Sequence, residues 1–223
     1  DDFTWENDKV AYRMYGPKCG STENVRAGVD VWSKKVATPV IDLWYARNDR
    51  GLDYHTDRGE GADFYKVGPT LGVGGCGYIH NDQLLAPKNW QKSKILEQGA
   101  KRIVFELTFA PFQVGSATVT EVKRVTLEKG ANLNLMESTF TIEGADSVQV
   151  AAGIRKSHND GAIFKVIEDG LAYSEVAGKN QTIYSALKMF DSDFSIVDKY
   201  DHHLIQVEIK NGQKLRYRSG AAW

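Results

Sequence analysis

The sequence predicts an all-β fold built from antiparallel sheets, and three observations lead to this prediction. After residue 102, apolar and polar side chains alternate with the period of two that a pleated strand requires. Turn sequences such as Asn211-Gly212 separate the alternating segments. The segments are short and closely spaced, which is typical of a sandwich or a barrel. The alternation is clearest at Ile103, Phe105, Leu107 and Phe109.

The two parts of the chain differ in pattern. In the first hundred residues we expect one strand, from Val10 to Tyr15, followed by long loops rich in glycine, charge and aromatic residues. Thr38-Pro39 predicts the start of a short helix, because threonine caps helices and proline is tolerated in the first turn. A chain of 223 residues fits one large β domain over residues 1–223. The later strands are expected at 103–109, 117–128, 133–143, 147–157, 162–167, 182–189, 203–210 and 214–218.

Composition excludes some classes of protein. The chain has 28 basic and 29 acidic side chains, so it lacks the positive surface that nucleic acid requires. No apolar run approaches the roughly 20 residues of a membrane span, and the N-terminus does not resemble a signal peptide. We therefore expect a cytoplasmic protein or a mature, processed one. A disulfide between Cys19 and Cys76 is neither required nor excluded by the sequence.

The densest group of polar residues lies between Asp53 and Tyr65, where a histidine, an arginine, several carboxylates and two phenols occur together. General acid–base catalysis uses these residue types where burial and neighbouring charges tune their pKa values. A solvated surface loop is the alternative. The glycine-rich run at residues 67–77 favours a site, because glycine allows tight backbone paths beside a ligand.

Two later strands also carry polar residues with more than one interpretation. Glu121 and Lys123 lie on the otherwise apolar face of the 117–128 strand, which indicates either a polar cavity or a β-bulge that turns them outward. His158 follows the 147–157 strand, at a strand end where scaffolds place functional groups, although most such histidines are simply on the surface. Trp5 is a candidate for stacking on a sugar ring, as are Trp44 and Trp90, although core packing is the commoner use of tryptophan.

Metal binding is not expected. The candidate ligands are His55 and Asp57, which are two residues apart, and the adjacent His202 and His203. Neighbouring residues on a strand point to opposite faces, so His202 and His203 are poor co-ligands unless they lie in a turn. No motif indicates a cofactor, since the glycine-rich run lacks the Lys-Ser/Thr ending of a phosphate-binding loop.

Three long segments resemble a known family: FTWENDKVAYRMYGP, YHTDRGEGADFYKVGPTLGVGGCG and MESTFTIEGADSVQVAAGI. They are similar to a domain-of-unknown-function family of bacterial polysaccharide-utilisation proteins, which is related to galactose-mutarotase-like proteins and includes an ulvan oligosaccharide dehydratase. The resemblance implies an antiparallel β-supersandwich with long N-terminal loops, a periplasmic or cell-surface location, and oligosaccharide ligands. Family members tend to be longer, so terminal segments, including the signal peptide, are expected to be absent from this chain.

These observations lead to a leading hypothesis of a carbon–oxygen lyase of dehydratase type that acts by β-elimination on uronic-acid-containing oligosaccharides. Such a reaction needs a cation to neutralise the carboxylate, a base and an acid. The candidate cations are Arg58 and Arg13, the bases His55 and His158, and the acids Tyr54 and Tyr65, with Asp57 orienting the histidine. The substrate-binding candidates are Arg13, Tyr65, Trp5, Glu121 and Lys123. An epimerase or mutarotase, or a non-catalytic carbohydrate-binding module, remains an alternative, and the sequence does not determine the oligomeric state.

Overall fold

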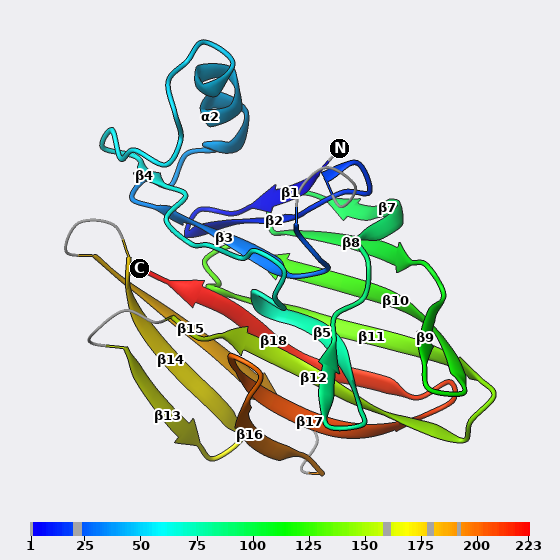
Figure 1. Ribbon diagram of the computed structural model, residues 1–223. Coiled ribbons are helices and arrows are strands. Elements are labelled where there is room, and N and C mark those ends of the chain that lie inside the picture. The colour runs from blue at the N-terminus through cyan, green and yellow to red at the C-terminus, as the bar shows by residue number, and fades with distance from the viewer. Residues whose placement is uncertain (1, 20–23, 158–161, 178–180, 191–192) are drawn as a thin grey trace.

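The computed structural model describes residues 2–19, 24–157, 162–177, 181–190 and 193–223. All strand pairs within its three sheets are antiparallel, which confirms the predicted fold class. The sheets face one another in layers, with the small N-terminal sheet and helix α2 at one end (Figure 1). None of the helices in these residues is long and apolar enough to cross a membrane.

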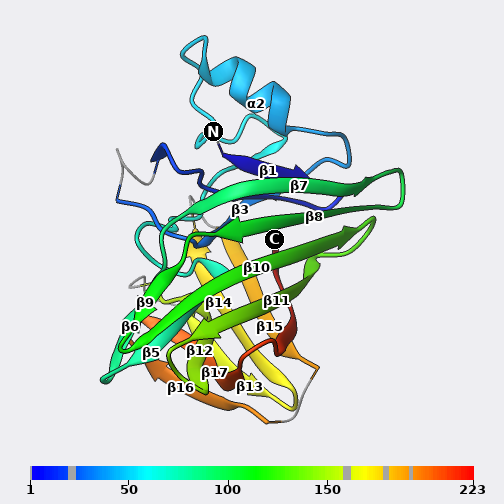
Figure 2. The ribbon, with the colours of Figure 1, turned by 90° about the vertical axis from the view of Figure 1, so that its right-hand side faces the viewer.

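The largest layer is a nine-stranded sheet, in the order β13-β14-β15-β18-β11-β10-β8-β7 with β9 paired to β10. Its strands curve around the other layers (Figure 2). The alternating burial along β10 and β11 shows one face turned to the core and the other to solvent. The strands are β7 (Trp90–Gln98), β8 (Arg102–Phe109), β9 (Phe112–Val114), β10 (Ala117–Glu128), β11 (Leu133–Glu143), β13 (Ile163–Ile167), β14 (Gly170–Ala177), β15 (Gln181–Met189) and β18 (Lys214–Ala222).

Two smaller sheets cover the inner face of the large sheet. The five-stranded sheet has the order β16-β17-β12-β5-β6 and the four-stranded sheet the order β1-β2-β3-β4. Ser219 Oγ of β18 donates to the Val73 carbonyl of β5 at 2.9 Å, which joins two layers directly. The strands are β1 (Phe3–Glu6), β2 (Val10–Met14), β3 (Val29–Lys34), β4 (Gly61–Ala62), β5 (Val73–His80), β6 (Gln83–Leu85), β12 (Ser147–Arg155), β16 (Ser195–Lys199) and β17 (His202–Lys210).

The expectation of one strand and long loops in the first hundred residues is wrong in part. Strand β2 is where Val10–Tyr15 predicts it, but β1 and β3 to β7 were not expected. β3 shows no alternation because all its residues are buried, on both faces of the sheet. The glycine-rich run forms β5, and a side chain at Gly75 would lie 2.6 Å from the Leu71 carbonyl oxygen. Glycine there serves close packing of the backbone.

Helix α2 (Ile41–Asn48) confirms the helix predicted after Pro39, but its cap differs from the predicted one. No side chain adjacent in sequence caps it. Instead, the carboxylate of Glu6 in β1 accepts hydrogen bonds from the backbone N–H of Val40 at 3.0 Å and of Ile41 at 3.1 Å. A carboxylate at this position also complements the helix dipole. The cap therefore ties the helix to the four-stranded sheet.

Glu121 and Lys123 face the interior, which decides between the two alternatives left open by the sequence. Strand β10 pairs with both neighbours without a register shift at these residues, so no bulge turns them outward. Lys123 Nζ lies 2.9 Å from Glu121 Oε1, donates to Ser138 Oγ at 2.8 Å and lies 3.3 Å from Cys76 Sγ. Both charged side chains are 1% exposed, so they form a buried ion pair that no ligand reaches.

The two cysteines lie in different environments. Cys76 is buried beside Lys123 and Tyr217, and burial raises the pKa of its thiol above the ordinary value. Cys19 lies near the N-terminus, where its thiol is 3.4 Å from Asp2 Oδ1. In the described part of the chain the two are not joined by a disulfide.

Candidate functional site

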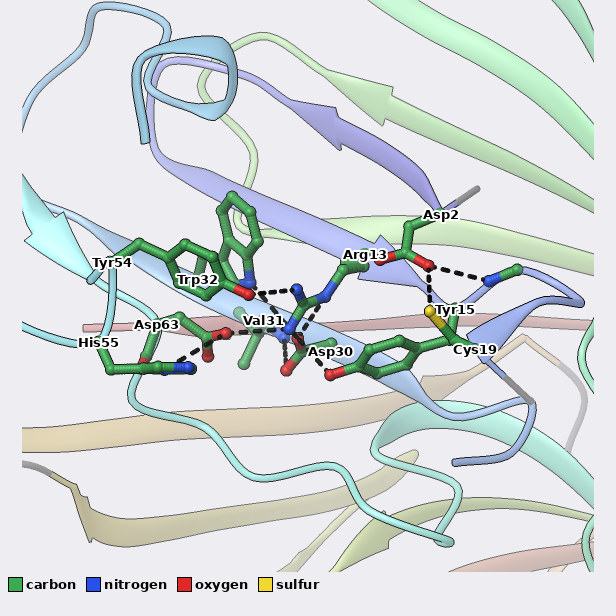
Figure 3. A network of polar contacts seen from close by, with 11 residues as sticks. Asp2, Arg13, Tyr15, Cys19, Asp30, Val31, Trp32, Tyr54, His55 and Asp63 are labelled. Atoms are coloured by element: carbon green, nitrogen blue, oxygen red, sulfur yellow. Dashed lines mark hydrogen bonds and ion pairs between the residues drawn. The ribbon is translucent and has the colours of Figure 1, made fainter. Parts of the chain in front are cut away.

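Arg13 is the centre of a polar cluster on one face of the four-stranded sheet (Figure 3). Strand pairing sets Arg13 of β2 directly opposite Asp30 of β3. The guanidinium donates to Asp30 Oδ2 from Nε at 2.9 Å and from Nη2 at 2.6 Å, and to Asp63 Oδ2 from Nη2 at 3.0 Å. It also donates to the hydroxyl of Tyr15 at 2.8 Å and of Tyr54 at 3.2 Å. One cation therefore holds two carboxylates and two phenols together.

The charges of this cluster are buried. Arg13 is 4% exposed, Asp30 0% and Asp63 2%. Burial raises the pKa of Asp63 well above its ordinary value, and the nearby charge of Asp30 adds to the effect against the attraction of Arg13. Burial also raises the pKa of Asp30, for which Arg13 is the main opposing influence. Burial and the repulsion between two carboxylates beside one guanidinium therefore both favour the protonated form of Asp63.

Tyr54 and His55 form the exposed edge of the cluster. The Tyr54 ring stacks on Trp32 with ring centroids 5.4 Å apart, and the His55 ring lies 4.7 Å from it. His55 Nδ1 is 2.8 Å from the backbone oxygen of Asp63, and 58% of the histidine side chain is exposed. The carbonyl can only accept a hydrogen bond, so we assign a proton to Nδ1, and in the neutral ring Nε2 is then the acceptor. A phenol and an imidazole base therefore lie side by side at the surface.

The rest of the predicted loop has a different role from the one expected. Asp57 does not orient His55: its carboxylate accepts from the backbone N–H of Gly59 at 2.8 Å and pairs with Lys35. Arg58 Nη1 donates to the Thr56 carbonyl at 3.1 Å and to the Asp53 carbonyl. These bonds shape the turn. The orientation predicted for Asp57 is supplied by the Asp63 backbone instead.

Arg58 and Tyr54 nevertheless line the same small notch, together with Trp44, Arg47, Leu52, Thr56, Glu60 and Gly61. The notch has a cavity volume of about 10 Å³, which is room for about one water molecule. A sugar ring is much larger than this. Any ligand larger than a water molecule would therefore lie across the exposed edges of Tyr54 and His55, with Arg58 beside it.

The other predicted site residues lie apart from this edge. Trp5 is 2% exposed, its Nε1 donates to Asn134 Oδ1 at 2.8 Å, and its ring packs against Phe105, so it is a core residue that cannot stack on a ligand. Glu121 and Lys123 form the buried ion pair between the layers. Tyr65 is buried beneath the guanidinium of Arg155, 4.5 Å from the ring centroid. His158 lies outside the described residues.

Arg13 lies near the loop, as predicted. Its guanidinium, however, is not free to contact a substrate. Its guanidinium donors are directed to protein acceptors, and only 5% of its side chain is exposed. Its role is to position Tyr54 and Asp63. Sequence reasoning missed Asp30 and Tyr15, which complete the cluster. The signal for Asp30 was an acidic residue in the apolar segment Val29–Trp32.

The described residues contain no group of three or more His, Cys, Asp or Glu side chains placed to hold a metal ion. Both ring nitrogens of His202 have backbone partners: Nε2 accepts from the Leu71 N–H at 3.0 Å, and Nδ1 is 2.6 Å from the Tyr200 carbonyl oxygen. Burial lowers the pKa of His202, which is consistent with a neutral ring.

The raised pKa of Asp63 predicts an unusual pH dependence of stability. A group whose pKa is higher in the folded state binds protons more tightly there, so its contribution is fully present below the ordinary value of 3.8. That contribution is lost as pH rises through the raised folded value. We therefore expect the free energy of unfolding of wild type, relative to that of Asp63→Asn, to fall as pH rises above the ordinary value of 3.8. Urea titrations at several pH values measure it, and a difference that rises with pH would contradict the assignment.

Comparisons with known proteins identify the family of the chain and structures with a similar fold. The family described as Domain of unknown function (DUF4861) matches residues 1–223. The chain is 32% identical over 240 residues to Uncharacterized protein P7 of Formosa agariphila, covering 100% of this chain. The chain spans 59% of the length of that curated relative.

Two solved structures show how the fold compares. A mutant of the heparan sulfate lyase HepC from Pedobacter heparinus has a TM-score of 0.50 at 9% identity, covering 99% of this chain and 34% of that one. A galactose mutarotase related enzyme from Lactobacillus acidophilus has a TM-score of 0.38 at 9% identity, covering 100% and 98%. At this identity the likeness to HepC concerns the fold alone.

Proposed function

Because the chain belongs to the DUF4861 family, whose description assigns no function, we propose a function from its own residues: a carbohydrate-active carbon–oxygen lyase of dehydratase type. Its substrates would be uronic-acid-containing oligosaccharides, such as those of ulvan, and its reaction a β-elimination. The reactive centre would be Tyr54 and His55, with Arg58 as the cation.

The observation that carries this proposal is the hydrogen bond between His55 Nδ1 and the Asp63 carbonyl, at 2.8 Å. It fixes the ring and leaves Nε2, on a half-exposed side chain, as the proton acceptor. The proton removed in β-elimination is on the carbon next to a carboxylate, and it needs a base of this kind.

Tyr54 supplies the acid. Its hydroxyl oxygen accepts a hydrogen bond from Arg13 Nη1 at 3.2 Å, so its own proton is available to another acceptor. The positive guanidinium also stabilises the phenolate that would form when this proton is given away. Stacking on Trp32 holds the ring in place.

The β-elimination would proceed in one step with a base, a cation and an acid. His55 Nε2 takes the proton from the carbon next to the carboxylate, and Arg58 stabilises the negative charge that develops on that carboxylate. The electron pair forms a carbon–carbon double bond and expels the hydroxyl group on the next carbon. Tyr54 gives its proton to that oxygen, which departs as water. Transfer of the proton from His55 to Tyr54 then restores the site.

Two further observations support carbohydrate chemistry. The sequence resembles polysaccharide-utilisation proteins in three long segments. The fold is similar to that of a heparan sulfate lyase, HepC, which is compatible with the proposal, although a shared fold does not assign function. A periplasmic or cell-surface location fits such a substrate, and we propose it on that basis.

The experiment is to incubate the protein with a panel of uronate oligosaccharides and to follow ultraviolet absorbance. A dehydratase creates a double bond conjugated with the carboxylate, so absorbance rises with time. An epimerase or a mutarotase leaves the absorbance unchanged. No rise with any member of a panel that includes ulvan, glucuronan and alginate oligomers would count against the proposal.

A further inference from the structure

Among the residues that the structure describes, buried polar atoms without a hydrogen-bond partner also occur outside the candidate site, on Tyr65 and Arg155, which are in contact, and on β15. In the described part of the chain, six buried side-chain nitrogen or oxygen atoms have no hydrogen-bond partner, and His203 Nδ1, one of the six, lies 3.7 Å from a carboxylate oxygen of Asp198. Native proteins pair almost all such atoms, with protein, water or ligand. The other five are Asp63 Oδ1, Tyr65 OH, Arg155 Nε, Gln181 Oε1 and Ser185 Oγ.

The register of the large sheet places two of these residues on one face. Ser185 pairs with Tyr173, and Gln181 pairs with Ala177, across β14 and β15. Directly paired residues share a face of a sheet, and residues two apart on a strand do too. This is the inner face, because Tyr173 and Ser185 are both 4% exposed.

The segment 63–65 connects this inner face to the candidate site. Asp63 contacts Arg13, as described above, whereas the ring of Phe64 stacks on Trp223 with centroids 5.1 Å apart. Tyr65 lies beneath Arg155, whose Nη2 is 3.3 Å from both carboxylate oxygens of Glu175 on β14. We call residues 63–65 the strap, because they extend from the Arg13 cluster to β14.

The chemistry of the unpaired atoms indicates a ligand class. Arg155 Nε can only donate, Gln181 Oε1 can only accept, and the two hydroxyls can do either. A ligand that satisfies all of them must offer donors and acceptors together. Sugar hydroxyls do both. The charge of Arg155 is already balanced by Glu175, so the place suits an uncharged ring better than an anion.

We propose that the inner face of β14–β15 beneath the strap, with Tyr65, Arg155 and Ser185, is a subsite for a neutral sugar residue. This inference rests on the proposed function for the identity of the oligosaccharide. The neutral residue would be a neighbour of the uronate at Tyr54 and His55, since the strap reaches both places.

Access to the subsite requires the strap to move. Between Asp63 and Tyr65 it has no regular secondary structure, and one backbone hydrogen bond joins Asp63 N to the Tyr54 carbonyl at 3.1 Å. Arg155, with 16% of its side chain exposed, marks where the ligand enters. Each unpaired buried atom disfavours the closed state without ligand, and hydroxyls that pair with these atoms would remove that cost.

The experiment measures affinity for a uronate tetrasaccharide by calorimetry, together with the melting temperature of each ligand-free variant. All proteins carry His55→Gln, which prevents turnover during the titration. Tyr65→Phe and Ser185→Ala should each weaken binding about tenfold, the value of one buried hydrogen bond, without lowering the melting temperature. Removing an unpaired hydroxyl costs the free protein nothing.

Tyr217→Phe is the matched control. Its hydroxyl donates to the Gly74 carbonyl at 2.7 Å in the core, so its loss should lower the melting temperature and leave the affinity unchanged. A carboxyl-reduced tetrasaccharide is titrated in the same way, and Tyr65→Phe should weaken its binding by the same factor.

Three results would overturn the subsite. These are unchanged affinity in both variants, a loss confined to the acidic tetrasaccharide, and no binding of either tetrasaccharide by the parent protein. Failure of the proposed function is distinguishable, because it appears as absence of product from wild type while the effects on affinity remain.

Discussion

Replacing His55 by glutamine is expected to lower kcat/KM on a uronate oligosaccharide by about 10² to 10⁴, the usual contribution of a general base. Glutamine keeps a hydrogen-bonding group near the Asp63 carbonyl but cannot take a proton at the position of Nε2. With 58% of the side chain exposed, the substitution should leave the free energy of unfolding nearly unchanged. Steady-state kinetics and a urea titration on the same preparation measure both quantities.

His80→Gln is the matched control, because His80 ends β5, close to Gly115 and away from the Arg13 cluster. Its kcat/KM should equal that of wild type. Tyr54→Phe should lower kcat/KM by a factor in the same range as His55→Gln, and the two effects should not add, since acid and base serve one step. Full activity of His55→Gln would show that His55 is not the general base.

Replacing Arg13 by alanine is expected to lower the free energy of unfolding by about 3–5 kcal/mol. The substitution leaves Asp30 and Asp63 buried without their cation, and it opens space beneath Trp32, over which the guanidinium lies at 5.0 Å from the ring centroid. Tyr54 also loses its hydrogen bond from Nη1. Urea denaturation followed by tryptophan fluorescence measures the change.

Two comparisons separate the buried charges from other effects. Arg102→Ala breaks an exposed ion pair with Glu97 and should lower the free energy of unfolding far less than Arg13→Ala does. A triple variant, Arg13→Met with Asp30→Asn and Asp63→Asn, removes the whole charged group and should be more stable than Arg13→Ala. If Arg13→Ala proves as mild as Arg102→Ala, the cluster does not hold the site together.

The later strands could be predicted because one face of each meets the core and the other meets solvent. The expected strands at 117–128 and 133–143 coincide with β10 and β11. The N-terminal strands give no such signal. β3 is buried on both faces, and β7 is exposed along most of its length, so neither alternates. The β14 strand was missed because small residues such as Ala172 and Ser174 blur its polar face.

The candidate site could be predicted only where its residues are close in sequence. Tyr54 and His55 are adjacent, and the structure places their rings 4.7 Å apart at one edge of the cluster. Asp30 comes opposite Arg13 through the register of β2 and β3, which requires knowing that β3 is a strand. Asp57 is turned away from His55 because the turn before β4 uses its carboxylate to bind Gly59 N–H. Backbone hydrogen bonding, which composition does not reveal, decided that outcome.

The central claim is that Tyr54 and His55 remove water from a uronate oligosaccharide, and mass spectrometry of the reaction products tests it most directly. Wild type is predicted to yield a product lighter than the substrate by the mass of one water, whereas His55→Gln, under the same conditions, leaves the substrate mass unchanged. A wild-type product of unchanged mass, or the same loss of water with His55→Gln, would contradict the account.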